Sequence, residues 1–276
     1  MSTSHRTRTK SASTVVPTQQ ANVGPIKEAR FQSWDDFKAT FCEHIFPGEA
    51  FHRGRYLFRG HSDATWRLTP TFDRMFESQP KQKRLQIAAD LLDRFRKSLE
   101  GFEDLPPQTR NDDSLLLALG QHYGLPTRLL DWTESPYIAA FFAFNRSALW
   151  GAHDQWIAIW VLDSTNPIWS ADYGVEIIDV PSFGNERIRN QSGKFTLSKT
   201  PFSALEDYAL EHGDENALMK WLLPSSEWKK ALADLDAMAI HHGRMYPERE
   251  GAAQMALFRT VAAHGAFIER PTSRPA

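Results

Sequence analysis

The sequence predicts an α+β protein with a short central β-sheet flanked by many helices. Apolar residues recur at helical spacing in several stretches, whereas short β-type runs lie near residue 58 and between residues 156 and 197. Helices, one strand, further helices, several strands and final helices follow one another, and this order differs from a regular βαβ winding. The chain is 41% hydrophobic and holds 9 Trp and 18 Phe, so it can bury a sizeable aromatic core.

Capping residues and the helical spacing of apolar residues predict the helices in the first half of the chain. Ser33 opens a capping signal ahead of a helix with an apolar face. Residues 81–100 form an amphipathic helix, and Asp112 or Asp113 caps the next one. Pro136 suits the first turn of a further helix. The other expected elements are strands at 56–59, 156–162, 175–180 and 194–197 and helices at 203–212, 215–223 and 226–240.

Composition and charge limit the function classes. The formal net charge of -2 gives no overall attraction to nucleic acid, and no apolar run is long enough to predict a membrane span. Cys42 is the one cysteine, expected as a buried small hydrophobe, so a disulfide within the chain is excluded and a cytoplasmic location is expected. Residues 1–25 are basic and rich in Ser and Thr and predict a disordered tail, and residues 26–270 form a single predicted domain.

The first candidate site is Arg59-Gly60-His61, which follows apolar strand residues. A guanidinium at a strand end offers a rigid fork of donors that suits a phosphate or a carboxylate. Gly60 allows a ligand or another backbone to approach closely. The structural alternative is an ion pair between Arg59 and a core carboxylate such as Asp131, and the two interpretations are compatible.

The second candidate site follows a predicted helix that ends at Gln121-His122-Tyr123. Beyond it the sequence predicts a loop dense in hydrogen-bond donors and acceptors. His122 is a candidate general acid or base, and a hydrogen-bonded structural histidine is the alternative. Asp131 is expected to pair with Arg128 or Arg59. The polar residues of this loop are Thr127, Arg128, Asp131 and Thr133.

Two weaker constellations lie further along the chain. Arg187 and Gln191 precede a glycine and a strand, a pattern that many polar loops share. His241 and His242 are adjacent, so their side chains face different ways and do not make a metal pair. No metal is expected, because HExxH and CxxC are absent, and the absence of Walker, GxGxxG and GxSxG motifs argues against P-loop, Rossmann and α/β-hydrolase classes.

These segments resemble those of FRG-domain proteins, a family named for the tripeptide that stands here at Phe58-Arg59-Gly60. The resemblance includes the block at 122–133, the helix that starts at Ser135-Pro136 and the turn at 247–251, and it extends from about residue 34 to about residue 267. It implies a single FRG domain. It also implies a role in a bacterial or phage conflict system, such as phage defence or a toxin.

A fainter resemblance is to ADP-ribosyltransferase-like folds, which often open with an aromatic-Arg-Gly strand that anchors NAD. It implies that Arg59 holds the pyrophosphate and that Thr133 belongs to the hydroxyl-bearing second element. The third element of those folds is a strand glutamate, and the corresponding segment here offers Gln191. Because Gln carries no negative charge, Glu186 or Glu176 is the candidate substitute.

The resemblances and the residues together define a candidate site for NAD. Tyr123 or Trp132 is expected to stack on the nicotinamide ring. The candidate catalytic residues are His122, Thr133, Glu186 and Gln191, and the candidate substrate-binding residues are Arg59, Gly60, Tyr123, Arg128, Asp131 and Trp132.

Three hypotheses for the function follow. The first is an enzyme that uses NAD, either an ADP-ribosyltransferase or an enzyme that resembles an NAD glycohydrolase. The second is a non-catalytic regulatory module that binds a small-molecule nucleotide and signals to a protein partner, and the near-neutral charge disfavours its nucleic-acid version. In the third hypothesis, the segments around Arg59 and around Asp131 are only the scaffold of an aromatic core, and Arg59 and Asp131 form a buried ion pair.

Overall fold

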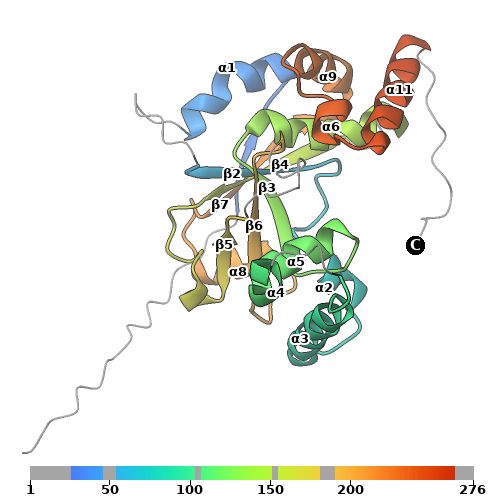
Figure 1. The fold of residues 1–276 in the computed structure, drawn as a ribbon. Coiled ribbons are helices and arrows are strands. Elements are labelled where there is room, and N and C mark those ends of the chain that lie inside the picture. The colour runs from blue at the N-terminus through green and yellow to red at the C-terminus, as the bar shows by residue number, and fades with distance from the viewer. Residues whose placement is uncertain (1–25, 46–53, 103–106, 151–154, 181–189, 265–276) are drawn as a thin grey trace, which may run out of the picture.

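The computed structural model describes residues 26–45, 54–102, 107–150, 155–180 and 190–264. Within these ranges the chain combines helices with a curled seven-stranded sheet in the order β1-β7-β4-β2-β3-β6-β5 (Figure 1). β1 and β7 run parallel, and the other neighbours run antiparallel. This mixture agrees with the α+β class. The sheet has seven strands, whereas the sequence predicted a short central sheet. The strands are β1 (Lys27–Arg30), β2 (Tyr56–His61), β3 (Leu129–Thr133), β4 (Trp156–Asp163), β5 (Val175–Ile178), β6 (Gly193–Ser198) and β7 (Leu218–Pro224).

Helices flank the sheet in separate groups. In Figure 1, α1, α6, α9 and α11 lie together above the sheet, and α2, α3, α4 and α5 form a second group at the lower right. The helices are α1 (Trp34–Ile45), α2 (Thr71–Met75), α3 (Lys81–Ser98), α4 (Pro107–Asn111), α5 (Asp113–His122), α6 (Pro136–Trp150), α8 (Leu205–His212), α9 (Trp228–Ala237), α10 (His242–Met245) and α11 (Arg249–His264), with short 3-10 turns at Ala171–Tyr173 and Ser225–Glu227.

Two large apolar cores hold the sheet between its helices, and a smaller third cluster joins α5 to β3 and β6. The larger one joins β2, β4 and β7 to α1, α6 and α9 and is aromatic, as its composition predicts. In it Trp34 stacks on Phe37 with ring centroids 5.3 Å apart, and Trp221 meets Phe37 edge-on at 5.9 Å. The second core lies on the opposite face, around Trp160 and Tyr208. Burial on both faces explains why β4 is an almost unbroken apolar run.

The predicted helix at 215–223 is wrong, because residues 218–224 form strand β7. This segment pairs with β4 over seven positions and with β1 over four, so it lies inside the sheet. Leu218 and Met219 belong to opposite cores, which is the alternation of a strand. A short apolar run fits a helix or a buried strand equally well on periodicity, and here the sheet partners decide.

Three smaller expectations also change. Residues 129–133, predicted as part of a loop, form β3 between β2 and β6. Cys42, in α1, is exposed and not buried as expected. The strand β1 was not predicted, since its sequence Lys-Glu-Ala-Arg is charged and mostly exposed, as is usual at a sheet edge. The predicted disordered tail at 1–25 lies outside the described residues.

The sheet opens between β2 and β3. These two neighbours are in register at one pair, Phe58 and Thr133, whereas β2 pairs with β4 over six positions. Beyond Phe58 the strands separate, and their facing backbone groups no longer form a ladder. The gap is therefore a place where side chains can enter the plane of the sheet.

Gly60 fixes the helix that lies over this gap. A Cβ atom at Gly60 would stand 1.9 Å from the carbonyl oxygen of Ala139 and 2.8 Å from the backbone nitrogen of Ala143, both in α6. A side chain is thus excluded by helix backbone. Of the two interpretations of Gly60, close approach of another backbone explains this glycine.

Gly60→Ala should lower the free energy of unfolding by roughly 3 kcal/mol or more, because the helix backbone must move to relieve the overlap. Urea unfolding followed by circular dichroism measures this change. Gly101→Ala is the matched control, since no atom lies within 4 Å of a Cβ placed there. Equal stability of the two variants would contradict the close packing of α6 on β2.

Candidate functional site

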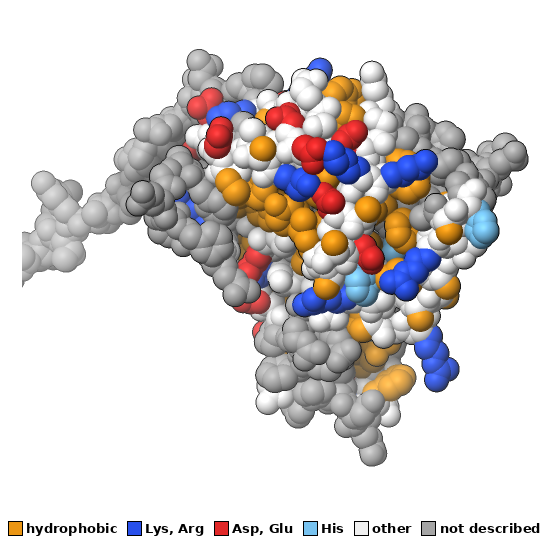
Figure 2. Space-filling view, turned by 90° about the horizontal axis from the view of Figure 1, so that it is seen from above, with side chains coloured by type: hydrophobic (Ala, Val, Ile, Leu, Met, Phe, Trp, Pro, Cys, Tyr) orange, Lys and Arg blue, Asp and Glu red, His pale blue; other side chains and the backbone are white. Residues whose placement is uncertain are grey.

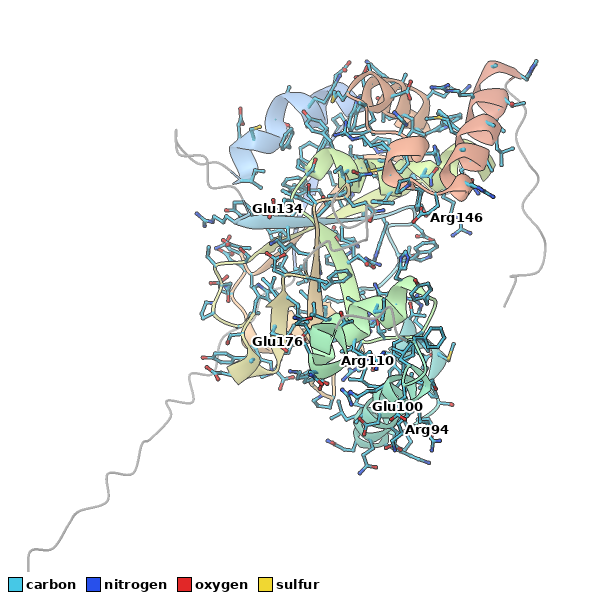
Figure 3. All side chains as sticks on the ribbon, viewed as in Figure 1. Arg94, Glu100, Arg110, Glu134, Arg146 and Glu176 are labelled. Atoms are coloured by element: carbon cyan, nitrogen blue, oxygen red, sulfur yellow. The ribbon has the colours of Figure 1, made fainter. Side chains whose placement is uncertain are left out.

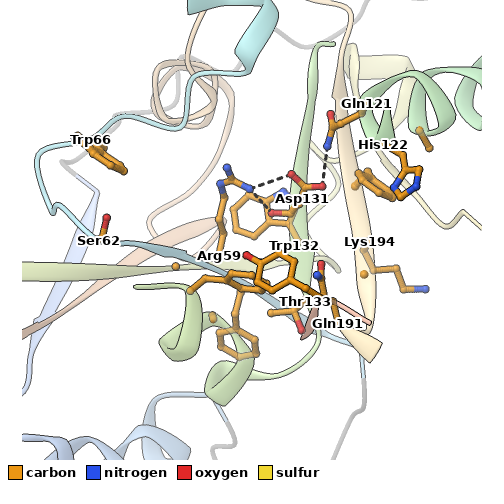
Figure 4. Close-up of a pocket in the computed structure, with 18 residues that line it drawn as sticks. Arg59, Ser62, Trp66, Gln121, His122, Asp131, Trp132, Thr133, Gln191 and Lys194 are labelled. Carbon is orange, nitrogen blue, oxygen red and sulfur yellow. Dashed lines mark hydrogen bonds and ion pairs between the residues drawn. The ribbon is translucent and has the colours of Figure 1, made fainter. Parts of the chain in front are cut away.

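A pocket of about 460 Å³ lies where β2 and β3 separate (Figure 4). Its volume falls within the range of small-molecule sites. Strands β2, β3 and β6 and helices α5 and α6 line it, together with Trp66 and Tyr246. The two segments singled out in the sequence, around Arg59 and around Asp131, therefore contribute to the same cavity.

Arg59 bridges the gap between the two strands. Its Nη1 donates a hydrogen bond of 2.8 Å to the carbonyl oxygen of Asp131 and lies 3.5 Å from the Asp131 carboxylate. Its Nε donates to Nε2 of His61 at 3.3 Å. No described residue accepts a hydrogen bond from Nη2, so this part of the fork is available to a ligand in the pocket.

The predicted pairing of Asp131 with Arg59 is confirmed, and the pair faces the pocket. The Arg59 side chain is 24% exposed and that of Asp131 57%, so the idea of a buried scaffold pair is wrong. The Asp131 carboxylate also accepts a 2.7 Å hydrogen bond from Nε2 of Gln121, whose carbonyl oxygen accepts from the Thr127 hydroxyl. Gln121 therefore orients the carboxylate.

His61 supports Arg59 from inside the sheet. It is buried, and this burial, together with the positive charge of Arg59, lowers the pKa of His61 from 6.5 to about 3. The ring is neutral at physiological pH, so Nε2 can accept from Arg59. Its Nδ1 lies 3.3 Å from the carbonyl oxygen of Trp66. His61 thus positions the guanidinium and does not itself line the pocket.

Four other predicted residues also line the pocket. His122 is exposed at its edge, at the end of α5. The buried Thr133 accepts a hydrogen bond from the backbone of Ser135 at 3.1 Å. Trp132 reaches the second core, where its Nε1 donates to the Thr196 hydroxyl at 3.0 Å, and with 2% of the residue exposed it has little ring face to offer a ligand. Gln191 donates to the carbonyl oxygen of Met245 at 2.9 Å.

Arg128 does not belong to the pocket. It is buried, and its guanidinium donates to the Asp73 carboxylate at 2.9 Å and to two backbone carbonyl oxygens. Arg84 approaches the same carboxylate at 3.5 Å. A guanidinium engaged on all sides has no donor for a substrate, so the prediction of Arg128 as a substrate-binding residue is corrected to a structural role.

Tyr123 and the substitute glutamates are not brought to the pocket. Tyr123 is 75% exposed and does not line it, because α5 ends there and its ring turns to solvent. Glu176 lies on the outer strand β5, well away from the gap (Figure 3), and pairs with Lys199 at 2.7 Å. Glu186 falls outside the described residues.

The prediction omitted several side chains that shape the pocket. Lys194 enters from β6 and forms ion pairs with Asp179 and, at 3.8 Å, with Glu134. Tyr246 forms part of the wall next to Phe142, with ring centroids 6.2 Å apart. A lysine that follows a glycine does not by itself indicate a site residue in the sequence. The segment that contains Tyr246 was singled out in the sequence, but Tyr246 was not predicted as a site residue.

Two further observations concern metals and membranes. The described residues hold no group of three or more His, Cys, Asp or Glu side chains placed to bind a metal ion. Among the helices in these same ranges, none combines the length and the apolar character needed to cross a membrane.

The site and the fold together define the class of protein: an α+β protein with a polar and aromatic pocket at an opening in its sheet. Residues 54–149 match the model of the FRG domain, which confirms the predicted family, and the chain thus carries an FRG domain. The match runs from β2 into α6 and includes Arg59, Gln121, His122 and Asp131. Neither the curated proteins nor the solved structures give a significant match to the chain.

Arg59→Ala and Arg128→Ala should differ in stability. Removing Arg128 leaves the buried Asp73 poorly compensated and should lower the free energy of unfolding by roughly 3–5 kcal/mol. Removing Arg59 from a partly exposed pair should lower it by about 1 kcal/mol or less. Thermal and urea unfolding of both variants check this contrast. Unfolding of the Arg59 variant at room temperature would restore the scaffold interpretation.

Stability should fall in mild acid because two buried histidines stay neutral in the fold. Burial lowers the pKa of His61 to about 3 and that of His242 to about 4, both from 6.5. Above pH 6.5 neither group affects stability, whereas below it the unfolded chain binds protons that the folded chain excludes. Each histidine should therefore remove about 2 kcal/mol between pH 7 and pH 5.

Urea unfolding at pH 7 and pH 5 measures this loss. His61→Gln and His242→Gln should each reduce the difference between the two pH values, and the exposed His264→Gln should leave it as in the wild type. A difference that both core variants retain in full would show that these histidines do not cause it.

Proposed function

We propose that the pocket binds a nucleotide, with NAD as the substrate, and that the protein transfers ADP-ribose or hydrolyses the nicotinamide glycosidic bond. One observation carries the proposal: a guanidinium with unengaged donors and an exposed carboxylate, Arg59 and Asp131, stand side by side in one aromatic-lined pocket. A guanidinium fork suits the pyrophosphate of NAD. A carboxylate suits the positive charge that develops on the ribose.

The chemical step places a defined demand on the carboxylate. The bond between ribose C1′ and the nicotinamide nitrogen breaks, and its electron pair leaves with nicotinamide, which becomes neutral. The ribose is left with oxocarbenium character, which a nearby negative charge stabilises. Among the pocket residues that the structure describes, Asp131 is the acidic one. In this proposal Asp131 takes the role that Glu186 had in the sequence-based assignment.

The second half of the reaction needs a nucleophile and a base. Water, or a hydroxyl or amine of an acceptor, adds to C1′ and gives up its proton. His122 is an exposed imidazole at the edge of the pocket and accepts this proton in the proposed scheme. Thr133 and Gln191 hold the walls through their hydrogen bonds to backbone and have no charge to contribute.

The alternative is a non-catalytic module that binds the nucleotide and signals to a protein partner. It is favoured by the engagement of Asp131 with both Arg59 and Gln121, which lowers the carboxylate's capacity to stabilise a cation. A nucleic acid is a weaker candidate ligand. The face seen from above mixes acidic, basic and apolar side chains in place of a continuous basic surface (Figure 2), and the net charge is -2. A role in phage defence or as a toxin is an expectation from family analogy alone.

The test measures NAD binding by calorimetry and nicotinamide release by chromatography, with water and with candidate protein acceptors. Arg59→Ala should weaken NAD binding roughly 10- to 150-fold, because a charge-assisted contact is lost. Asp131→Asn should bind NAD within a few-fold of the wild type and release nicotinamide roughly 100-fold or more slowly. Arg94→Ala, on the distant helix α3 (Figure 3), is the matched control and should behave as the wild type.

The outcomes separate the two functions. Binding that depends on Arg59 without any nicotinamide release supports the non-catalytic module. Absence of NAD binding by the folded wild-type protein overturns the proposal as a whole.

A further inference from the structure

Trp66 differs in exposure from the tryptophans of the two cores. Trp34, Trp132, Trp160 and Trp221 are buried in the two cores, whereas Trp66 is 38% exposed and lines the pocket. An aromatic ring left exposed beside a cavity keeps a flat apolar face in contact with water. Such a face gains free energy when another flat ring covers it.

Hydrogen bonds anchor the backbone of the loop that carries Trp66. The backbone nitrogen of Trp66 donates to the carbonyl oxygen of Asp63 at 3.1 Å, and its carbonyl oxygen is contacted by His61. The next residue, Arg67, donates to the buried Glu206 at 2.8 Å. The Trp66 ring also meets the buried His61 ring edge-on, with centroids 6.2 Å apart, so the backbone is preorganised and less conformational entropy is lost when a ligand stacks on the indole.

A positive charge lies against the same ring. The guanidinium carbon of Arg146, from α6, stands 5.0 Å from the centre of the Trp66 ring. Arg146 does not line the pocket, and it forms no ion pair with any residue that the structure describes. The Trp66 ring thus contacts a cation that does not itself line the cavity.

This charge discriminates between the two rings of NAD. The oxidised nicotinamide ring is cationic, and a second cation close to the indole disfavours it by repulsion. Adenine is neutral and stacks on the platform without this penalty. At the other end the Asp131 carboxylate favours the cationic nicotinamide riboside. Arg59 lies between Trp66 and Asp131 in the view of Figure 4, where a pyrophosphate would join the two halves.

We infer that Trp66, backed by Arg146, is the adenine-stacking site of the pocket, and that NAD lies with its adenine at Trp66 and its nicotinamide riboside at Asp131. The inference rests on the proposed function for the identity of the ligand. It adds the substrate class, an adenine-containing dinucleotide, and the direction in which the dinucleotide lies.

The experiment compares three probes by calorimetry: NAD and its two halves, AMP and nicotinamide mononucleotide. Trp66→Ala should weaken AMP and NAD roughly 5- to 150-fold, the range for loss of one base-aromatic stack, and leave nicotinamide mononucleotide within about 2-fold. Trp66→Phe keeps a ring and should restore most of the AMP affinity. Tyr173→Ala is the matched control, because Tyr173 is also an exposed aromatic residue and does not line the pocket.

Arg146→Met tests the role of the charge. It should reduce the preference for AMP over nicotinamide mononucleotide roughly 2- to 5-fold, which corresponds to one exposed cation–π contact. An unchanged preference would overturn the role of Arg146. Should Trp66→Ala melt early, Trp66→Leu, which keeps apolar bulk without a ring face, answers the same question.

Each result points to a different conclusion. If the wild type binds NAD and Trp66→Ala weakens nicotinamide mononucleotide in place of AMP, or weakens neither half, the inference is overturned while the proposed function stands. If the folded wild type binds none of the three probes, the proposed function fails and the inference fails with it.

Discussion

The opening between β2 and β3 is the constraint on which the rest of the site depends. Two strands that are neighbours in a sheet ordinarily satisfy each other's backbone groups, but here the ladder is reduced to the pair Phe58 and Thr133. The Arg59 guanidinium supplies the missing donor to the Asp131 carbonyl oxygen at 2.8 Å. One side chain therefore adds a hydrogen bond across the opening and, at the same time, turns a charged group toward the cavity that the separation of the strands creates.

Burial decides why two arginines from neighbouring motifs behave differently. Arg128 lies inside the protein, where an unpaired charge is too costly, so Asp73 and backbone carbonyl oxygens surround it. Arg59 keeps contact with water, and its pairing with Asp131 is loose at 3.5 Å. A ligand can replace such a contact at small cost. The distinction makes Arg128 a fixed part of the architecture and Arg59 a group that can exchange partners.

Much of the fold was predictable because its signals are local. Caps and helical spacing predicted the helices around Phe37, Leu92, Leu116 and Ala139, and the structure places α1, α3, α5 and α6 there. Strand β7 was not predictable in this way, because the partners that make Leu218–Pro224 a strand come from β1 and β4. Long-range pairing overrides local preference in such a segment.

The site was predictable to a similar extent. The sequence indicated that Arg59 pairs with Asp131, since a charge beside a core needs a partner. It could not distinguish Arg128 from Arg59, because burial depends on the tertiary arrangement. It also gave no weight to Trp66, whose importance arises from its position beside the pocket and from Arg146, which comes from a helix far along the chain.

Part of the pocket wall, Gln191 and Tyr246, comes from a stretch of the chain beyond the matched FRG segment. Asn190 and Gln191 donate hydrogen bonds of 2.9 Å to the carbonyl oxygens of Arg244 and Met245, which tie the residues just before β6 to the segment that presents Tyr246. The charged pair Arg59 and Asp131 and this part of the wall thus come from separate segments of the sequence. Changes in the wall can alter ligand selectivity while the Arg59 contact stays intact, so one scaffold of this kind can evolve toward different ligands by exchanging its late segments.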